Sequence, residues 1–487
     1  MSWKVVAGRG LAAGLLLTAS LPPFGWWILG LVGAALLADT LVRLDGMRMR
    51  LLAGAAAGLT LYAVGWFWMS EFSVPGYVIA VLIEVAILSA ASVTVARGRL
   101  WAVPAALVLA EYVRDHFPFG GVPLAGLPLG QVGGPLAPAA RLGGQLLVVA
   151  LMGAIGAAAV AALRRRFVFA TVALVLTVAC VVGGHLATGT HRTGTLTVAA
   201  VQGGGRRGLR AIYGDPTQVF EAQLRASAQV RPPVDLVVWP EDVIDVDRVQ
   251  GSPQADTVSN VARFLDTTVV AGIVEDSGPN HFANAALAWD PDGRIVARFD
   301  KVHRVPYGEY IPFRGIVKHF ANLDAVPRDA RAGNGPGVLN TAAGRLGVAI
   351  SYEVFFSDRA RIAARHGAAV MLVPTNASSF STGQVPAQEL AAARLRAMES
   401  GRWVVQAAPT GYSAVVTSGG RVLAHSDLGR PDVIRRTVER RAGQTPATRL
   451  GDGLPAVAAL LAGGAALALP RRRARSPLDR SVNFPAG

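Results

Sequence analysis

The segment KVHRVPYGEYIP, residues 301 to 312, follows a short apolar run and sets a lysine and a glutamate on either side of a Pro-Tyr-Gly sequence. Two other apolar runs end in polar groups: VVWPE, residues 237 to 241, and VAISYE, residues 348 to 353. Each feature alone is ordinary, because a Glu, Lys or Ser after a strand is usually solvated or forms a turn. Together they mark three strand ends, at Glu241, Lys301 and Ser351, where chemistry is expected.

These strand ends lie in residues 195–440, which alternate short β-rich runs with amphipathic helical segments. The pattern predicts strands at 195–202, 235–240, 267–274, 284–289, 295–299, 346–351, 368–374 and 403–407, and helices at 216–229, 257–265, 358–366 and 388–400. Apolar strands that alternate with helices indicate a layered α/β or α+β domain.

Long apolar stretches dominate the rest of the chain. They cover residues 10–21, 26–42, 51–69, 77–96, 100–113, 142–163, 167–186 and 454–469. Several of them reach the roughly 17 to 25 residues that cross a bilayer. We therefore predict a multispan α-helical membrane domain of about seven spans in residues 1–190 and a further span at 454–470, with the α/β domain between them.

The composition agrees with a membrane protein. The chain has 487 residues, of which 52% are hydrophobic and 16% charged, and these values exclude a disordered chain and argue against an ordinary soluble enzyme. The single cysteine, Cys180, excludes a disulfide framework and a zinc site built from several cysteines.

The formal net charge of +15 has a topological explanation. Basic residues cluster at alternate junctions between the apolar stretches: Lys4, Arg9, Arg43, Arg48, Arg50, Arg97, Arg99, Arg164, Arg165, Arg166, Arg471, Arg472, Arg473 and Arg475. The connections at 22–25 and 70–76 carry none. By the positive-inside rule this pattern predicts a multi-pass cell-membrane protein with both termini in the cytoplasm, including the tail 471–487, an uncleaved first span, and the α/β domain outside. The positive charge is therefore explained without a nucleic-acid partner.

Two carboxylates, Glu84 and Glu111, interrupt apolar stretches. An ionisable group within a membrane is costly, which suggests that these side chains face the interior of the helix bundle or a cavity. A position at the membrane interface, close to Arg114 and Asp115, is the alternative for Glu111.

The three strand ends resemble, in this order, those of the nitrilase superfamily, which carry its Glu-Lys-Cys triad. The PYGEYIP sequence at 306–312, the Pro374-Thr375-Asn376 turn and the ARLRAME sequence at 393–399 add to the resemblance. Over nearly its full length the chain is similar to the apolipoprotein N-acyltransferase branch. This resemblance implies an extracytoplasmic nitrilase-like α/β domain with an αββα sandwich, carried by the multispan membrane domain.

The resemblance also implies a reaction, the transfer of an acyl chain from a phospholipid to the N-terminal amino group of a diacylated lipoprotein. In that family Glu is the general base, Lys stabilises the oxyanion, and Cys carries the acyl group. These roles fall on Glu241, Lys301 and the position of Ser351, while Glu309 and Glu353 match further acidic residues of the family's site. The reaction needs no metal or cofactor, and no histidine pair here has a convincing metal-ligand spacing.

Ser351 departs from the family at the nucleophile. A thiol is partly ionised near neutral pH, whereas a serine hydroxyl normally needs a well-placed base. This leaves two hypotheses: an N-acyltransferase that works through an acyl ester on Ser351, and a catalytically weakened homologue that serves as a membrane scaffold or partner, for example of a separate glycosyltransferase such as a polyprenyl-phosphate mannose synthase. An amidase for soluble substrates would not need the membrane spans.

Overall fold

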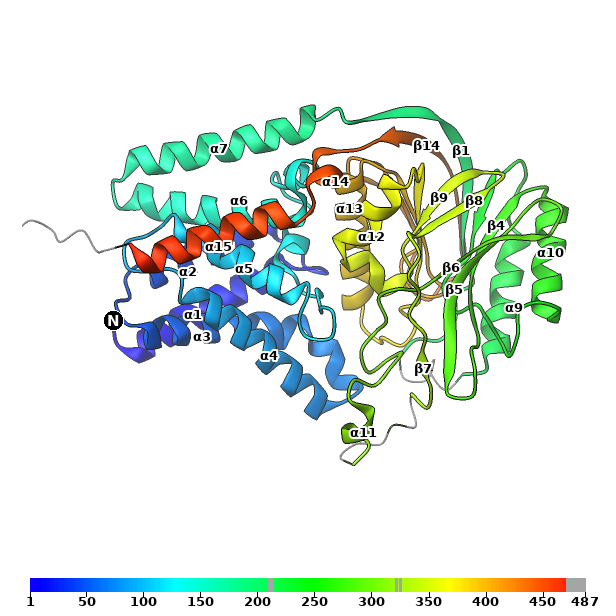
Figure 1. Ribbon diagram of the computed structural model, residues 1–487, viewed down its shortest axis with the longest axis horizontal. Coiled ribbons are helices and arrows are strands. Elements are labelled where there is room, and N and C mark those ends of the chain that lie inside the picture. The colour runs from blue at the N-terminus through cyan, green and yellow to red at the C-terminus, as the bar shows by residue number, and fades with distance from the viewer. Residues whose placement is uncertain (209–213, 320–322, 324–325, 470–487) are drawn as a thin grey trace, which may run out of the picture.

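The computed structural model describes residues 1–208, 214–319, 323 and 326–469, and it consists of a helical bundle beside a two-sheet sandwich (Figure 1). The predicted cytoplasmic tail 471–487, with its five arginines, lies outside the described residues.

A helix occupies the place of each predicted span. The bundle contains α1 (Trp3–Ser20), α2 (Trp27–Leu41), α3 (Met47–Gly65), α4 (Val74–Ser92), α5 (Ala102–Arg114), α6 (Ala140–Leu163), α7 (Phe167–Leu186) and α15 (Gly453–Ala468). By length and composition α4, α7 and the helical segment 137–163 that includes α6 can cross a membrane, and α2 and α15 are shorter apolar helices. The chain is therefore a multi-pass membrane protein.

The two carboxylates of the bundle are buried against one arginine. Glu84 on α4 and Glu111 on α5 are 0% and 2% exposed, and both form ion pairs with Arg114, which is itself fully buried. Of the two sequence interpretations of Glu111, the structure supports the interior one. Arg114 also donates to the backbone oxygen of Leu124, so it joins two helices to the loop after α5.

The first sheet has the strand order β14-β1-β2-β4-β5-β6, with β3 paired to β4 and β7 to β5. The strands are β1 (Thr190–Gln202), β2 (Leu236–Val238), β3 (Ile244–Val246), β4 (Thr268–Asp276), β5 (His281–Trp289), β6 (Ile295–Asp300), β7 (Asp329–Ala330) and β14 (Asp432–Gly443). Strands β1, β2 and β4 are parallel, and β6 shares the direction of β4 because both are antiparallel to β5.

The second sheet has the order β13-β12-β11-β10-β9-β8. Its strands are β8 (Val338–Thr341), β9 (Gly344–Val348), β10 (Val370–Pro374), β11 (Val404–Ala407), β12 (Ala414–Val416) and β13 (Val422–His425). The central strands β9, β10 and β11 are parallel. Their carboxyl ends therefore lie at one edge of the sheet, where active sites of such sheets usually form.

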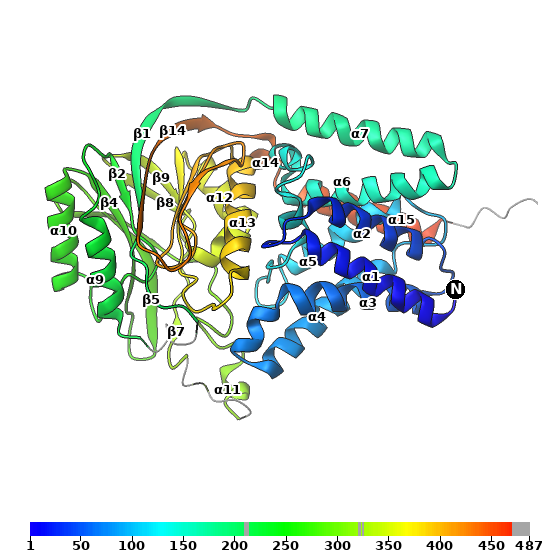
Figure 2. The same ribbon diagram turned by 180° about the vertical axis from the view of Figure 1, so that it is seen from behind.

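Three apolar layers hold the sandwich together. Valines and leucines of both sheets, among them Val198, Leu236, Leu346 and Leu372, form the core between the sheets. Helices α9 (Pro216–Ser227) and α10 (Pro253–Leu265) cover the outer face of the first sheet (Figure 2). Helices α12 (Ser357–Arg365) and α13 (Gln384–Ser400) cover the second sheet and share one continuous core with the membrane helices. The predicted αββα sandwich on a helical membrane domain is confirmed.

Helix α13 is the main contact between the two domains. Gln384 donates to the backbone oxygens of Val64 and Gly65 at the end of α3, at 2.8 and 3.0 Å. Arg394 reaches the backbone oxygen of Val132 at 3.1 Å. Side chains along the helix thus bind the bundle over several turns, which fixes α13 relative to the membrane domain.

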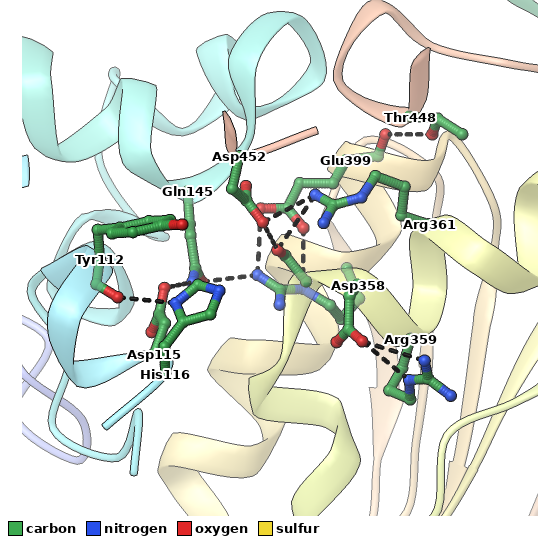
Figure 3. Close-up of polar contacts among 12 residues, drawn as sticks. Tyr112, Asp115, His116, Gln145, Asp358, Arg359, Arg361, Glu399, Thr448 and Asp452 are labelled. Atoms are coloured by element: carbon green, nitrogen blue, oxygen red, sulfur yellow. Dashed lines mark hydrogen bonds and ion pairs between the residues drawn. The ribbon is translucent and has the colours of Figure 1, made fainter. Parts of the chain in front are cut away.

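The far end of α13 enters a polar network at the domain boundary (Figure 3). Gln145 of α6 donates to Asp115 at 2.6 Å and accepts from Arg396 of α13 at 2.8 Å. Asp452, which directly precedes α15, accepts from Arg361 of α12 at 2.9 Å. Helix α6 is kinked beside this network, and Gly144 adopts a φ of +69° there, a conformation that favours glycine. The network ties three membrane helices to the helices behind the second sheet.

Candidate active site

Four strands position the residues of the candidate site. Glu241 follows β2, Lys301 follows β6, Ser351 follows β9 and Thr375 follows β10, each just beyond a carboxyl end. Within each sheet these strands run in the same direction. Hydrogen bonds between Val302 and Glu353 and between Asn376 and Asp242 join the strand ends of the two sheets. The local sequence explains the strands themselves, since LVV, VMLVP and the run before Ser351 are apolar and buried.

Three of the predicted residues form one buried ion cluster. Lys301 Nζ lies 2.8 Å from Glu241 Oε1 and 2.9 Å from Glu309 Oε1. Asn284 on β5 donates to the same two oxygens, at 2.8 Å each. The ammonium of Lys301 and the amide of Asn284 therefore both bind Glu241 and Glu309, and together they hold the two carboxylates side by side.

The charge state of Lys301 results from these neighbours. Burial alone would lower its pKa, but attraction by Glu241 and Glu309 and hydrogen bonds to both carboxylates raise the pKa above its usual value. Lys301 is thus a fixed positive charge in a site from which water is largely excluded, since only 2% of its surface is exposed. A fixed cation of this kind stabilises negative charge that develops nearby in a reaction.

The backbone of β4 packs closely against the backbone of Glu241. A Cβ atom at Gly272 of β4 would lie 2.4 Å from the Cα atom of Glu241, so this position requires glycine. The neighbouring Asp242 has a positive φ of 56° and accepts a hydrogen bond from Asn376 at 3.3 Å. Burial, and next the charge of Glu241, raise the pKa of Asp242 well above its usual value. The buried position of Asp242 beside Glu241 therefore disfavours its charged form.

Ser351 belongs to a different cluster. It opens the short 3₁₀ turn Ser351–Phe355 with a positive φ of 49°, a conformation that a serine adopts only when its surroundings impose it. Its Oγ lies 3.4 Å from Glu389 Oε1 and 3.3 Å from Thr375 Oγ1. The hydroxyl of the candidate nucleophile is thus directed to a carboxylate on α13.

Glu353 joins the two clusters through the backbone. Its Oε1 accepts from the amides of Val302 and His303, at 2.8 and 3.1 Å, and its Oε2 accepts from the amide of Ile350 at 2.8 Å. The side chain is fully buried. Glu353 therefore fixes the segment after Lys301 against the turn of Ser351, and we assign it a positioning role.

We expect Glu353→Ala to lower the free energy of unfolding by roughly 2 to 5 kcal/mol, because three amide groups lose their acceptor and a buried group left unsatisfied costs about 1 to 3 kcal/mol. Glu353→Gln should cost less, because the amide oxygen still accepts. Unfolding in detergent measures both, with Glu221→Ala, at an exposed position of α9, as the matched control. An unchanged unfolding midpoint in Glu353→Ala would contradict this assignment.

Asn284, Thr375 and Glu389 belong to the site but are not marked as functional by the sequence. Asn284 is a polar residue within an otherwise apolar buried strand, which is a usable signal. Thr375 stands out in the sequence only as part of a turn, and Glu389 falls on a predicted helix whose packing face the sequence does not specify. Among the described residues, no group of three His, Cys, Asp or Glu side chains is placed to hold a metal ion.

Comparison with known proteins covers both domains. The family model described as carbon-nitrogen hydrolase matches residues 197–447, and the apolipoprotein N-acyltransferase N-terminal domain matches residues 13–158. An apolipoprotein N-acyltransferase of Mycolicibacterium smegmatis is 30% identical over 92% of this chain and 82% of its own length. Another, of Vibrio vulnificus, is 26% identical over 90% of this chain and 92% of its own length.

Among solved structures, Nit3 of Saccharomyces cerevisiae, a member of branch 10 of the nitrilase superfamily, is similar to about half of this chain. It is 22% identical, covers 51% of this chain and 91% of its own length, and aligns with a TM-score of 0.40.

Proposed function

Because the chain belongs to the apolipoprotein N-acyltransferase family, we propose that it N-acylates lipoproteins through an acyl ester on Ser351, with a phospholipid as the acyl donor. Family membership makes the protein a membrane-embedded acyltransferase that acts on lipoproteins. The nucleophile, the acyl donor and the side of the membrane are the parts that we add.

The observation that carries the proposal is the pair of buried clusters at one set of strand ends. Lys301 supplies a fixed positive charge, held by Glu241 and Glu309, and Ser351 supplies a hydroxyl in contact with a carboxylate. Acyl transfer requires these parts: a nucleophile, a proton acceptor and a stabiliser of the tetrahedral oxyanion.

Each residue of the site has a role in one of two steps. Oγ of Ser351 attacks the ester carbonyl carbon of the phospholipid and gives its proton to a neighbouring carboxylate, which passes it to the glycerol oxygen as the lysophospholipid leaves. The acyl chain remains as an ester on Ser351. The amino group of the lipoprotein then attacks the same carbon and gives a proton to Glu241, which passes it to Oγ of Ser351 as the ester bond breaks and the amide forms. Lys301 stabilises the oxyanion in both steps.

The position of the site beside the bundle supports a lipid donor. Phe380, in the loop after β10, packs against Trp68 and Phe72 of the membrane domain, with ring centroids 5.0 and 5.5 Å apart. An apolar contact between the site loops and the bundle offers an acyl chain an apolar neighbour. From the positive-inside pattern we place the sandwich on the extracytoplasmic side and the N-terminus in the cytoplasm.

Mass spectrometry tests the proposal with protein in vesicles of phosphatidylethanolamine and phosphatidylglycerol that carry isotope-labelled acyl chains. A synthetic diacylated lipopeptide should gain one labelled acyl chain on its amino group, and Glu241→Ala should abolish the product while Glu221→Ala retains it. A lipopeptide with a blocked amino group should not react. Absence of product with the native protein, together with product from Ser351→Cys, would overturn the serine mechanism and favour the weakened homologue.

A further inference from the structure

The contact between Ser351 and Glu389 bears on the main chemical difficulty of a serine at this site. Ser351, Thr375 and Glu389 come from the ends of β9 and β10 and from α13, and their exposed fractions are 7%, 0% and 3%. A carboxylate buried this deeply is rare unless it is paired or has a function. Neither the ion cluster of Lys301 nor the domain-boundary network includes Glu389.

The hydrogen-bond pattern leaves Glu389 able to accept a proton from Ser351. Thr375 has one hydroxyl proton, and its contact with Glu389 Oε1, at 2.6 Å, is shorter than its contact with Ser351 Oγ, at 3.3 Å. The threonine proton therefore points to Glu389, and the Ser351 hydroxyl donates to the same carboxylate oxygen at 3.4 Å. The second oxygen of Glu389 is buried and accepts no hydrogen bond from the described residues. Such contacts are often long without substrate and tighten in the reacting complex.

Glu241, in contrast, is already engaged. Its Oε1 accepts from both Lys301 and Asn284 at 2.8 Å. This oxygen already accepts two hydrogen bonds, so the other oxygen of Glu241 is the one left to take up a proton, in the amine step. The two carboxylates therefore differ in what they can do for a serine.

The charge environment of Glu389 agrees with a proton-transfer role. Burial is the main reason that its pKa is raised to about 7, and the charge of Glu241 acts in the same direction. The hydroxyls of Thr375 and Ser351 and the charge of Lys301 act in the opposite direction. A general base is most effective when its pKa lies near the working pH. Glu389 meets this condition without a histidine.

We propose that Glu389 is the general base and acid of the first half-reaction, in which Ser351 becomes acylated. This inference rests on the proposed function. As Oγ of Ser351 bonds to the ester carbonyl carbon, its proton passes to Glu389. When the bond from that carbon to the glycerol oxygen breaks, Glu389 gives the proton to the leaving oxygen. Glu389 ends as a carboxylate, and Glu241 is left for the amine step.

The test compares Glu389→Gln in two backgrounds, the native Ser351 and the variant Ser351→Cys. The rate of acyl-enzyme formation from labelled phospholipid is followed by mass spectrometry of the peptide that contains residue 351. In the native background we expect a loss of roughly 100-fold or more, the usual size of a general-base contribution. In the cysteine background we expect less than about 10-fold loss, because a thiolate does not need this base.

Comparison of the two backgrounds distinguishes a failure of the Glu389 proposal from a failure of the serine mechanism. Equal losses in both backgrounds would show that Glu389 only supports the fold and would overturn the proposal, as would an undiminished rate in the native background. A native protein that never becomes acylated, beside an active Ser351→Cys variant, would overturn the serine mechanism itself. Activity of the cysteine background with Glu389→Gln shows that the substitution leaves the protein folded.

A pH profile provides a second readout. Since the unprotonated form of Glu389 is the base, the acylation rate of the native protein should rise as the pH increases through its pKa of about 7 and then level off. Glu389→Gln should remove this rise. Glu241 and Lys301 are the charged groups with the largest effect on the pKa of Glu389. The charge of Glu241 raises this pKa, so Glu241→Gln should move the rise in rate to lower pH without removing it.

Discussion

Replacement of Ser351 by alanine is expected to lower N-acylation by roughly 10⁴- to 10⁶-fold, the usual cost of losing a catalytic nucleophile. The hydroxyl is the only part of the side chain that is removed, and alanine has the same difficulty with a positive φ as serine, so the turn should keep its shape. Unchanged thermal unfolding should accompany the loss, and no acyl mass should appear on residue 351.

The cysteine variant gives the opposite expectation. Ser351→Cys places a more acidic nucleophile on the same atom position, and its activity should equal or exceed that of the native protein. The matched control is Ser227→Ala, which removes the hydroxyl of another buried serine, on α9, that donates to the carbonyl oxygen of Gln223. A Ser351→Ala variant with undiminished turnover would exclude an acyl ester on this residue.

Replacement of Lys301 by methionine should have the second largest effect, on both stability and activity. The substitution leaves Glu241 and Glu309 without their shared cation in a buried site. Breaking a buried pair in this way typically costs about 3 to 5 kcal/mol, because a buried charge is left uncompensated. Turnover should fall by roughly 10²- to 10³-fold or more, because the oxyanion loses its stabilising charge.

A second substitution separates the two effects of Lys301. In the double variant Lys301→Met with Glu309→Gln, one of the stranded charges is gone, so part of the lost unfolding free energy should return while activity stays low. Lys318→Met is the natural control, because Lys318 is exposed. Denaturant unfolding and the lipopeptide assay measure the two quantities. Full activity in Lys301→Met would show that the oxyanion is stabilised by other groups.

Local sequence was sufficient to predict the core strands and the polar residues at their ends. The apolar runs that end near Glu241, Lys301 and Ser351 form β2, β6 and β9, with the polar residues just past the strand ends as expected. An apolar buried strand can be recognised from the sequence alone, because the apolar pattern lies in its own residues. A helix also occurs at every predicted apolar stretch, and among the described residues three of these helices are long and apolar enough to cross a membrane.

Strands that form because a neighbouring strand pairs with them are harder to predict from the sequence. β14, with the sequence DVIRRTVERRAG, is rich in arginine and carries no apolar run, yet it pairs with β1 from Thr190 to Gln202. The same pairing extends β1 to Thr190, five residues before the predicted start at Thr195. Such strands form because a neighbouring strand satisfies their backbone hydrogen bonds, and a local pattern does not show this neighbour.

The sequence by itself determined the two-domain architecture, the order of the strands that carry Glu241, Lys301 and Ser351, and the family to which the chain is similar. Only the tertiary structure decided that Asn284 holds two carboxylates on Lys301, that Glu353 binds backbone amides, and that Glu389 reaches Ser351. The physical reason is that apolar periodicity is a local property of the chain. Hydrogen bonds between side chains 38 or 60 residues apart depend instead on how sheets and helices pack.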